Sequence, residues 1–194
     1  MMPQRKLNRL HGYNYSTPGS YFVTICAHQR FEDRNIFGHI HEGVMEKNYR
    51  AEIVEDCWQG LPDHYSHVIP DEFVVMPDHI HGIIWITDMA VGNGFKPFPT
   101  GKPNHGLPEI IRGLKTFSSR RINKLNDKNN FQWQKSYYDH IIRNDESLHK
   151  IREYIRNNPT KWELDHDHNE EREITRIVGN GFKPFRNKMK RDIL

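Results

Sequence analysis

Apolar residues in the first third of the chain form runs typical of strands and one stretch with helical spacing. Residues 21–27 follow a turn cluster at 16–19 and are rich in β-forming side chains, which predicts a central strand. Residues 36–45 predict a short hairpin with Gly43 in its turn. Over residues 49–61 the apolar positions recur at helical spacing, which predicts an amphipathic helix that a proline ends.

The middle of the chain combines two β-rich runs with a long polar insertion. Residues 68–69 and 73–76 form one run and residues 80–86 the other, and the Pro-Asp pair between them indicates a tight antiparallel connection. Residues 88–107 are rich in Gly, Pro and Asn, which predicts a loop insertion.

The last third predicts two helices around a strand. Residues 108–125 place apolar side chains on one helical face and have proline in the first turn. Residues 131–143 indicate an edge strand. A final helix is expected from about residue 145 to Asn158, because Pro159 cannot continue it. This order of elements fits one α+β domain, an antiparallel sheet with helices on one face.

Composition narrows the class of protein. The chain has 194 residues, of which 36% are hydrophobic and 27% charged. No apolar run approaches the roughly 18 residues of a bilayer span, and no signal peptide follows the basic N-terminus. The two cysteines, Cys26 and Cys57, form no CxxC motif, which excludes a zinc-thiolate module and fits a reducing compartment. We expect a cytoplasmic protein with no membrane partner.

The net charge of +3 hides a reversal of sign along the chain. Residues 42–72 hold eight acids against two basic residues, whereas residues 108–124 hold five basic residues against Glu109 alone. Residues 182–192 add five more basic residues against one acid. Such basic segments favour a phosphate-rich partner, although a solvated helix face would carry the same charges.

Two histidines stand two positions apart in the second β-rich run. Because residues two apart on a strand share a face, His79 and His81 project together and can hold a divalent metal. The same spacing occurs at His39 and His41 and within residues 166–168, so the pattern alone selects no site. Their position in a predicted central hairpin favours His79 and His81 over the other two pairs, and the structural alternative is a pair of ordinary half-exposed histidines.

A zinc protein is a further alternative. It would use His64 and His67 together with His79 and His81, but these positions lack a convincing four-ligand spacing.

The predicted last helix carries Tyr154 and Asn158 one turn apart on one face. In a structural interpretation, Tyr154 packs in the core and Asn158 caps the helix. Beside a metal, the phenol can attack phosphorus and the amide oxygen can serve as a neutral ligand. The alternative nucleophiles are Tyr137 and Tyr138, which fall on a predicted strand among apolar residues and have no amide one helical turn away.

Several separated motifs, in this order, are similar to one family, the REP-associated tyrosine transposases. These are relatives of the single-strand insertion-sequence transposases in the HUH endonuclease superfamily. The resemblance covers roughly residues 13–162, with Asp78 as a departure where the family usually has Asn. The motifs are residues 19–25 (Gly-Ser-Tyr-Phe-Val-Thr-Ile), Phe37-Gly38, residues 76–83 (Met-Pro-Asp-His-Ile-His-Gly-Ile), Trp133-Gln134 with residues 137–143, and residues 154–159 (Tyr-Ile-Arg-Asn-Asn-Pro).

The resemblance implies a ferredoxin-like (RRM-like) antiparallel sheet and a defined site. His79 and His81 would be the HUH metal ligands, Asn158 the third ligand and Tyr154 the nucleophile. It also divides the chain into three parts, which are a basic arm at 1–12, the nuclease domain at 13–162 with its insertion, and a polar to basic tail at 163–194.

The implied activity is metal-dependent cleavage and transfer of single-stranded DNA at a hairpin or palindrome. Cleavage would leave a 5′-phosphotyrosine and a free 3′-OH. Histidines with a neutral amide favour loosely bound Mg²⁺ or Mn²⁺. We expect a nucleoid-associated monomer or homodimer. The alternative is a non-catalytic DNA-binding regulatory protein, which would keep the fold and the basic face but need neither Tyr154 nor a metal.

Basic residues of the predicted helices are candidates to grip the single-strand backbone. Phe131 and Trp133 can stack on bases, but core packing is the favoured interpretation for both. The basic candidates are Arg112, Lys115, Arg120, Arg121, Lys135, Arg152 and Arg156.

An octapeptide, Val-Gly-Asn-Gly-Phe-Lys-Pro-Phe, occurs at residues 91–98 and again at 178–185. Identity at every position is stricter than a Gly-rich turn demands. Because Gly-Phe-Lys-Pro can be encoded by the self-complementary GGGTTTAAACCC, we interpret both as translated copies of a palindromic mobile element. Codons that break this self-complementarity would exclude the interpretation.

Overall fold

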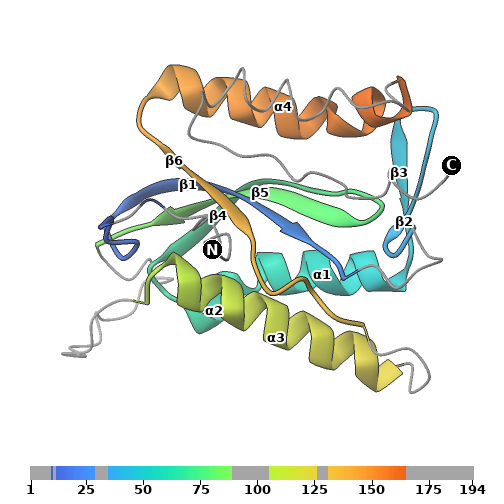
Figure 1. Cartoon of the computed structure of the whole chain (residues 1–194), viewed down its shortest axis with the longest axis horizontal. Coiled ribbons are helices and arrows are strands. Elements are labelled where there is room, and N and C mark those ends of the chain that lie inside the picture. Colours follow the sequence, from blue (N-terminus) through green and yellow to red (C-terminus); the bar gives the residue numbers. More distant parts are fainter. Residues whose placement is uncertain (1–9, 11, 29–34, 89–104, 126–130, 165–194) are drawn as a thin grey trace, which may run out of the picture.

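A four-stranded antiparallel sheet forms the centre of the molecule (Figure 1). The computed structural model describes residues 10, 12–28, 35–88, 105–125 and 131–164. The strands are β1 (Gly19–Cys26), β4 (Val68–Val75), β5 (His79–Ile86) and β6 (Tyr138–Ile142). They lie in the order β4-β5-β1-β6, so β1 and β5 are central and β4 and β6 form the edges.

Helices cover both faces of this sheet (Figure 1). One face packs against α1 (Tyr49–Gln59), the short α2 (Leu61–His64) and α3 (Leu107–Leu125), and the other against α4 (Asp145–Leu164). With α1 after β1 and α3 after β5, the arrangement is the predicted ferredoxin-like one. The prediction that the helices lie on one face is wrong for α4, which follows β6 and returns across the opposite face.

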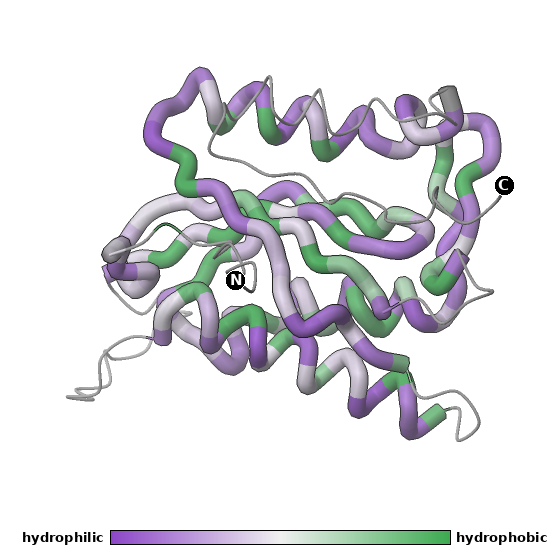
Figure 2. The backbone as a smooth tube through the Cα atoms, in the orientation of Figure 1, coloured by the Kyte–Doolittle hydropathy of each residue, from purple (hydrophilic) through white to green (hydrophobic). Residues whose placement is uncertain are grey.

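The central strands are apolar on both sides, which explains why both faces are covered. On β1, Val23 and Ile25 pack into the core with α1 and α3, whereas Phe22 packs with Ile83 and Ile151 against α4. Because strand side chains alternate between faces, an uninterrupted apolar run indicates burial on both sides. Figure 2 shows the hydrophobic positions of α4 recurring on its sheet-facing side.

Outside the main sheet, β2 (Gly38–His41) and β3 (Val44–Lys47) form the predicted hairpin. Its turn has positive φ at Glu42 (53°) and Gly43 (72°), as a two-residue type I′ turn requires. The Glu163 carboxylate, near the end of α4, accepts hydrogen bonds from both of these backbone N–H groups, at 2.9 and 2.5 Å. The hairpin tip is therefore fastened to the last turn of α4.

Helix α4 continues beyond its predicted end, because Pro159 lies inside the helix. A proline at this position removes the backbone hydrogen bond to the carbonyl four residues earlier. Tertiary contacts of the following turn offset that loss, since Glu163 binds the hairpin and the Trp162 ring lies 5.6 Å from the ring of His79. The prediction that the helix ends at Asn158 is wrong, because it considered only the local backbone preference of proline.

Residues 131–143 contain less strand than predicted. In this segment only β6 pairs continuously with β1, and Trp133 makes an isolated bridge with Ala27. The rings of Phe131 and Trp133 are buried against Phe37, with centroids 5.6 and 5.3 Å from it. The favoured interpretation of these two aromatics as core residues is confirmed.

Gly82 on β5 leaves room for the Trp58 ring, and this gives a test of the packing. A Cβ atom at residue 82 would lie 2.4 Å from Trp58 Cζ2, and that ring is stacked on Phe73 at 4.6 Å. We expect Gly82→Ala to lower the free energy of unfolding by about 1–3 kcal/mol, as overpacked cores do. Urea denaturation measures this value, and an unchanged midpoint would contradict the packing described.

Several expectations fall outside the described residues. They concern nearly all of the basic arm, most of the insertion, the tail beyond residue 164 and both octapeptides. Within the described ranges, no helix is both long and apolar enough to cross a membrane.

Candidate active site

Strand pairing brings two histidines and a threonine together on the α4 face of the sheet. Thr24 on β1 lies directly opposite His81 on β5, and Cys26 lies opposite His79. His79 and His81 share this face because they are two apart on one strand. Both are buried, with 5% and 1% of their surface exposed.

Helix α4 adds a tyrosine and an amide one helical turn apart. The Tyr154 hydroxyl lies 3.3 Å from His81 Nε2. Phe22 contacts both rings, stacked on His81 with centroids 5.5 Å apart and edge-on to Tyr154 at 6.1 Å. Asn158 is buried and shares the helix face of Tyr154. The structure therefore brings the predicted nucleophile to the predicted histidine pair.

Hydrogen bonds at Nδ1 orient the two imidazoles. His79 Nδ1 lies 2.6 Å from Asp78 Oδ1, and a hydrogen on Nδ1 that bonds this carboxylate leaves Nε2 for another partner. His81 Nδ1 lies 2.8 Å from the Thr24 hydroxyl. The two Nε2 atoms face each other at 3.0 Å. Histidines held at one nitrogen by such partners are typical of metal ligands.

The donor atoms of this cluster suit a divalent metal. Two bonds of about 2.1 Å at a right angle place their donors about 3.0 Å apart, so the Nε2 separation of 3.0 Å fits neighbouring ligands of one octahedral ion. Among the residues that the structure describes, no group of three or more His, Cys, Asp or Glu side chains could hold a metal. A third protein ligand would be of another type, and Asn158 on the adjoining helix supplies an amide oxygen.

Sequence reasoning missed two members of the cluster, Thr24 and Phe22. Their positions follow from the register of β1 against β5, which the alternation within a single strand does not reveal. Asp78 was singled out only as a departure from a family pattern, and its contact with His79 depends on the turn before β5.

The histidines of the alternative sites lie apart from this cluster. His39 and His41 are exposed on β2, where His39 Nε2 lies 2.8 Å from a carboxylate oxygen of Glu46. His64 stacks on Phe117 and His67 Nε2 contacts a backbone carbonyl, so the four-histidine zinc alternative is wrong. These rings are held on the α3 side of the sheet. The pair at 166–168 lies outside the described residues.

Comparison with known proteins points in the same direction. The family described as "Transposase IS200 like" matches residues 98–158, which include Tyr154 and Asn158. An uncharacterised protein of Haemophilus influenzae is 38% identical over 171 residues, covering 83% of this chain and 91% of that protein. The chain belongs to the IS200-like transposase family.

This transposase also shares its fold with a solved structure, a REP-associated tyrosine transposase bound to a REP hairpin. The TM-score is 0.52 at 18% identity, and the match covers 79% of this chain and 73% of that one. The predicted resemblance is confirmed in family and in fold.

The alternative nucleophiles of the transposase lie on different sides of the sheet. Tyr137 is buried in the core that α3 covers, with the Lys115 ammonium 5.5 Å from its ring centre. Tyr138 stands on β6 opposite Thr24, on the histidine side. Tyr138 is thus separated from His81 by one strand, whereas Tyr154 contacts it.

The basic residues predicted on α3 and Lys135 lie on the face of the sheet remote from the histidines. Arg112, Arg120 and Lys135 are exposed and line a hollow of about 850 Å³ between α3 and residues 131–137. A hollow with a cationic rim is a suitable surface for a nucleic acid backbone.

Two other α3 residues from the predicted set have structural contacts. Lys115 Nζ donates to the carbonyl oxygens of Gln134 and Ser136, each at 2.9 Å, which ties α3 to the segment before β6. Arg121 pairs with Asp56 of α1 at 3.0 Å.

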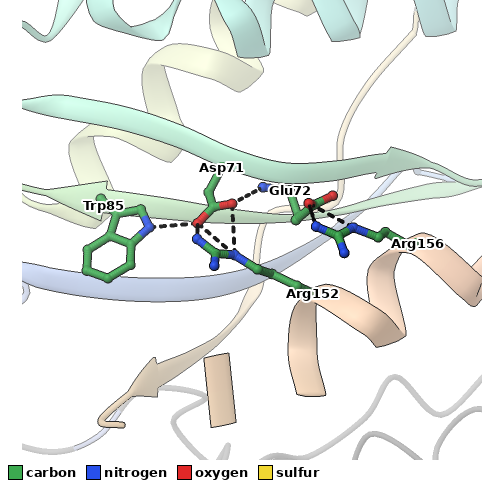
Figure 3. A network of polar contacts seen from close by, with 5 residues as sticks. All are labelled: Asp71, Glu72, Trp85, Arg152 and Arg156. Carbon is green, nitrogen blue, oxygen red and sulfur yellow. Dashed lines mark hydrogen bonds and ion pairs between the residues drawn. The ribbon is translucent and has the colours of Figure 1, made fainter. Parts of the chain in front are cut away.

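The two predicted DNA-binding arginines of α4 pair with acids of β4 (Figure 3). Arg152 Nη2 lies 2.5 Å from Asp71 Oδ2, and its Nε lies 3.1 Å from Oδ1. Arg156 Nε donates to Glu72 at 2.9 Å. The Asp71 carboxylate also accepts from the Trp85 indole at 2.8 Å.

The surroundings of Asp71 keep it ionised. Burial raises the pKa of this carboxyl, but the hydrogen bonds from Arg152, Trp85 and the Glu72 backbone outweigh burial and hold the pKa below its ordinary 3.8. Because the pKa of Asp71 is lower in the folded state, its ionised form stabilises the protein at every pH above the ordinary pKa of an aspartate. This stabilisation is lost as the pH falls through the lowered pKa of the folded state. The ion pair is therefore fully formed at neutral pH.

Proposed function

We propose that this transposase is a metal-dependent single-stranded DNA endonuclease and strand transferase that forms a covalent phosphotyrosine. The observation that carries the proposal is the contact at 3.3 Å between the Tyr154 hydroxyl and His81 Nε2, beside a second imidazole at 3.0 Å. A phenol next to a pair of oriented imidazoles combines a nucleophile with groups that can hold a phosphate-activating cation.

In the proposed cleavage, the Tyr154 oxygen attacks the phosphorus of the scissile phosphodiester in line with the leaving 3′ oxygen. The bond from the tyrosine oxygen to phosphorus forms as the bond from phosphorus to the 3′ oxygen breaks. The phenol loses its proton and the 3′ oxygen gains one, which gives a 5′-phosphotyrosine and a free 3′-OH. Because a phenol has a pKa of about 10, it leaves more readily than an alkyl alcohol, and a 3′-OH can reverse the step.

His79, His81 and Asn158 would hold Mg²⁺ or Mn²⁺, of which Mn²⁺ suits imidazole better. When bound, the ion polarises the scissile phosphate and offsets the charge that develops on it. Asp78 and Thr24 keep both Nε2 atoms aimed at this position.

The Tyr154 hydroxyl has two positions in this proposal. A ligand nitrogen directs its lone pair at the ion, so His81 Nε2 would not also hold the Tyr154 hydroxyl while it acts as a ligand. In the loaded enzyme Tyr154 gives up the contact with His81, and its oxygen turns toward the phosphate. Phe22 packs edge-on to the ring and keeps it at the site through this change.

We propose hairpin-bearing single-stranded DNA as the substrate, because the transposase with a similar fold was solved with a REP hairpin. The exposed basic residues Arg112, Arg120 and Lys135 would contact its backbone. Since these residues and Tyr154 are on opposite faces of the sheet, DNA that touches both must pass around an edge of the sheet.

Binding should weaken steeply as salt rises. Each phosphate contact on a single strand contributes about −0.7 to the slope of log K against log salt concentration. We expect Arg112→Gln and Arg120→Gln each to make the slope shallower by about 0.7. Lys47→Gln is the matched control, because Lys47 pairs with Glu55 away from the hollow, at 2.7 Å. Fluorescence anisotropy across salt concentrations measures the slopes, and a flat wild-type response would contradict a basic DNA surface.

The decisive experiment incubates the protein with hairpin oligonucleotides and Mn²⁺ and looks for a protein-DNA adduct that survives denaturation. An adduct attached to the 5′ end of the downstream fragment supports the proposal. Tight hairpin binding without any adduct would favour the regulatory alternative instead.

A further inference from the structure

The edge strand β4 contains a bulge that aims two acids at α4. Pro70 pairs with Ile84 and Phe73 with Gly82, so two residues of β4 stand opposite one residue of β5. The two residues of the bulge are Asp71 and Glu72. Neighbouring strand residues normally point to opposite faces, but at this bulge both acids reach arginines of the same helix (Figure 3).

The contact is strongest at Asp71. Its carboxylate accepts hydrogen bonds from Nε and Nη2 of Arg152 and from the indole N–H of Trp85. Only 14% of the Asp71 side chain is exposed. The second pair, Glu72 with Arg156, is more open to solvent, since 60% of the Arg156 side chain is exposed. Partly buried, two-pronged pairs resist screening better than open ones.

These arginines sit where they control the orientation of the nucleophile. Successive helix residues turn by about 100°, so Arg152 and Arg156 lie on one flank of the buried stripe that contains Ile151 and Ile155. Tyr154 lies on the other flank. Any rotation of α4 about its axis that loosens the arginines also moves the Tyr154 hydroxyl against His81.

The covalent connection that precedes α4 lies at the far edge of the sheet. Helix α4 follows β6 directly, and β6 is the edge strand opposite β4 in the order β4-β5-β1-β6. The ion pairs fasten the helix to the other edge, so that it is held across the full width of the sheet.

We propose that Asp71 and Glu72 form a clamp on Arg152 and Arg156 that positions Tyr154 for attack. The proposal rests on the proposed function, and it makes the four clamp residues positioning residues rather than DNA ligands. Productive geometry requires a catalytic group to be held within roughly 0.5 Å and 10–20°.

The competing interpretation is that the arginines bind DNA phosphates. The two interpretations predict opposite effects of Asp71→Asn. Removing the acid would free a cation and tighten DNA binding if Arg152 contacted phosphate. If Arg152 positions the helix, the same change leaves affinity unchanged and slows the chemical step.

The test uses three clamp variants, which are Asp71→Asn, Arg152→Gln and the double variant that combines these two changes. Glu146→Gln is the control. The control breaks an exposed pair within α4, in which Lys150 Nζ lies 2.6 Å from Glu146, and leaves the clamp intact. We expect each single clamp variant to slow single-turnover adduct formation by about 10- to 100-fold, with unchanged Kd for the hairpin. The double variant should be no slower than the worse single one, because both remove the same contact.

A second readout separates the clamp from the chemistry. Hydrogen exchange of the α4 amides should be faster in Asp71→Asn than in Glu146→Gln, with α3 unchanged in both. If wild type forms no adduct, the proposed function fails, and exchange still decides whether the clamp exists. Unchanged exchange in α4, additive losses of rate, or an altered Kd in the clamp variants would overturn the proposal.

Discussion

Tyr154→Phe is expected to abolish the covalent adduct while leaving DNA binding intact. The substitution keeps the ring, which is 4% exposed and packed edge-on against Phe22, and removes only the attacking oxygen. Because phenylalanine has no oxygen that could form the bond to phosphorus, we expect the rate of adduct formation to fall by more than about 10³-fold. Denaturing electrophoresis of labelled oligonucleotide measures the adduct, and anisotropy measures binding.

Tyr138→Phe is the matched control for this experiment. Tyr138 stands on the histidine side of the sheet but one strand away from His81. We expect it to retain adduct formation. An adduct that persists in Tyr154→Phe and disappears in Tyr138→Phe would show that Tyr138 is the nucleophile.

The second large effect is expected at the histidine pair. His79→Ala or His81→Ala should remove metal-dependent cleavage, since either change deletes an Nε2 donor from the cluster. Loss of a cation that supplies several kcal/mol of transition-state stabilisation corresponds to about 10³-fold or more in rate. Titration with Mn²⁺, followed by its paramagnetic signal, should show weaker binding in the same variants.

His39→Ala serves as the control, because His39 has the same sequence spacing to a second histidine but is exposed beside Glu46. We expect wild-type cleavage and metal binding in this variant. If folded His39→Ala protein lost cleavage and metal binding to the same extent, the assignment of the metal site to His79 and His81 would be wrong.

Local patterns predicted most of the elements because they depend on side chains close in sequence. The apolar run of β1, the hairpin at Gly43 and the amphipathic α3 were all found from period and turn residues. The candidate site histidines rest on the same kind of pattern, since alternation on β5 is a local property. Local patterns could not predict which helix covers each face of the sheet.

The parts that were missed depend on contacts between distant segments. Thr24 reaches His81 through the register of two strands, 57 residues apart in sequence. Asp71 and Arg152 are 81 residues apart and meet only because of a bulge. The end of α4 was misplaced at Pro159 because the hairpin contact that sustains the next turn is equally remote. Charge alone suggested DNA contact for Arg152 and Arg156, and the ion pairs offer them a different role.

The contact of Glu163 with the hairpin has a practical consequence for anyone who shortens this protein. All four candidate catalytic side chains lie before residue 159, so a fragment ending there looks sufficient for activity. Such a fragment lacks Trp162, whose ring lies 5.6 Å from the ring of His79, and the carboxylate that binds the amides of Glu42 and Gly43. The His79 ring would lose this neighbour, and the hairpin would lose its hydrogen bonds to α4. A shortened transposase should therefore keep Trp162 and Glu163.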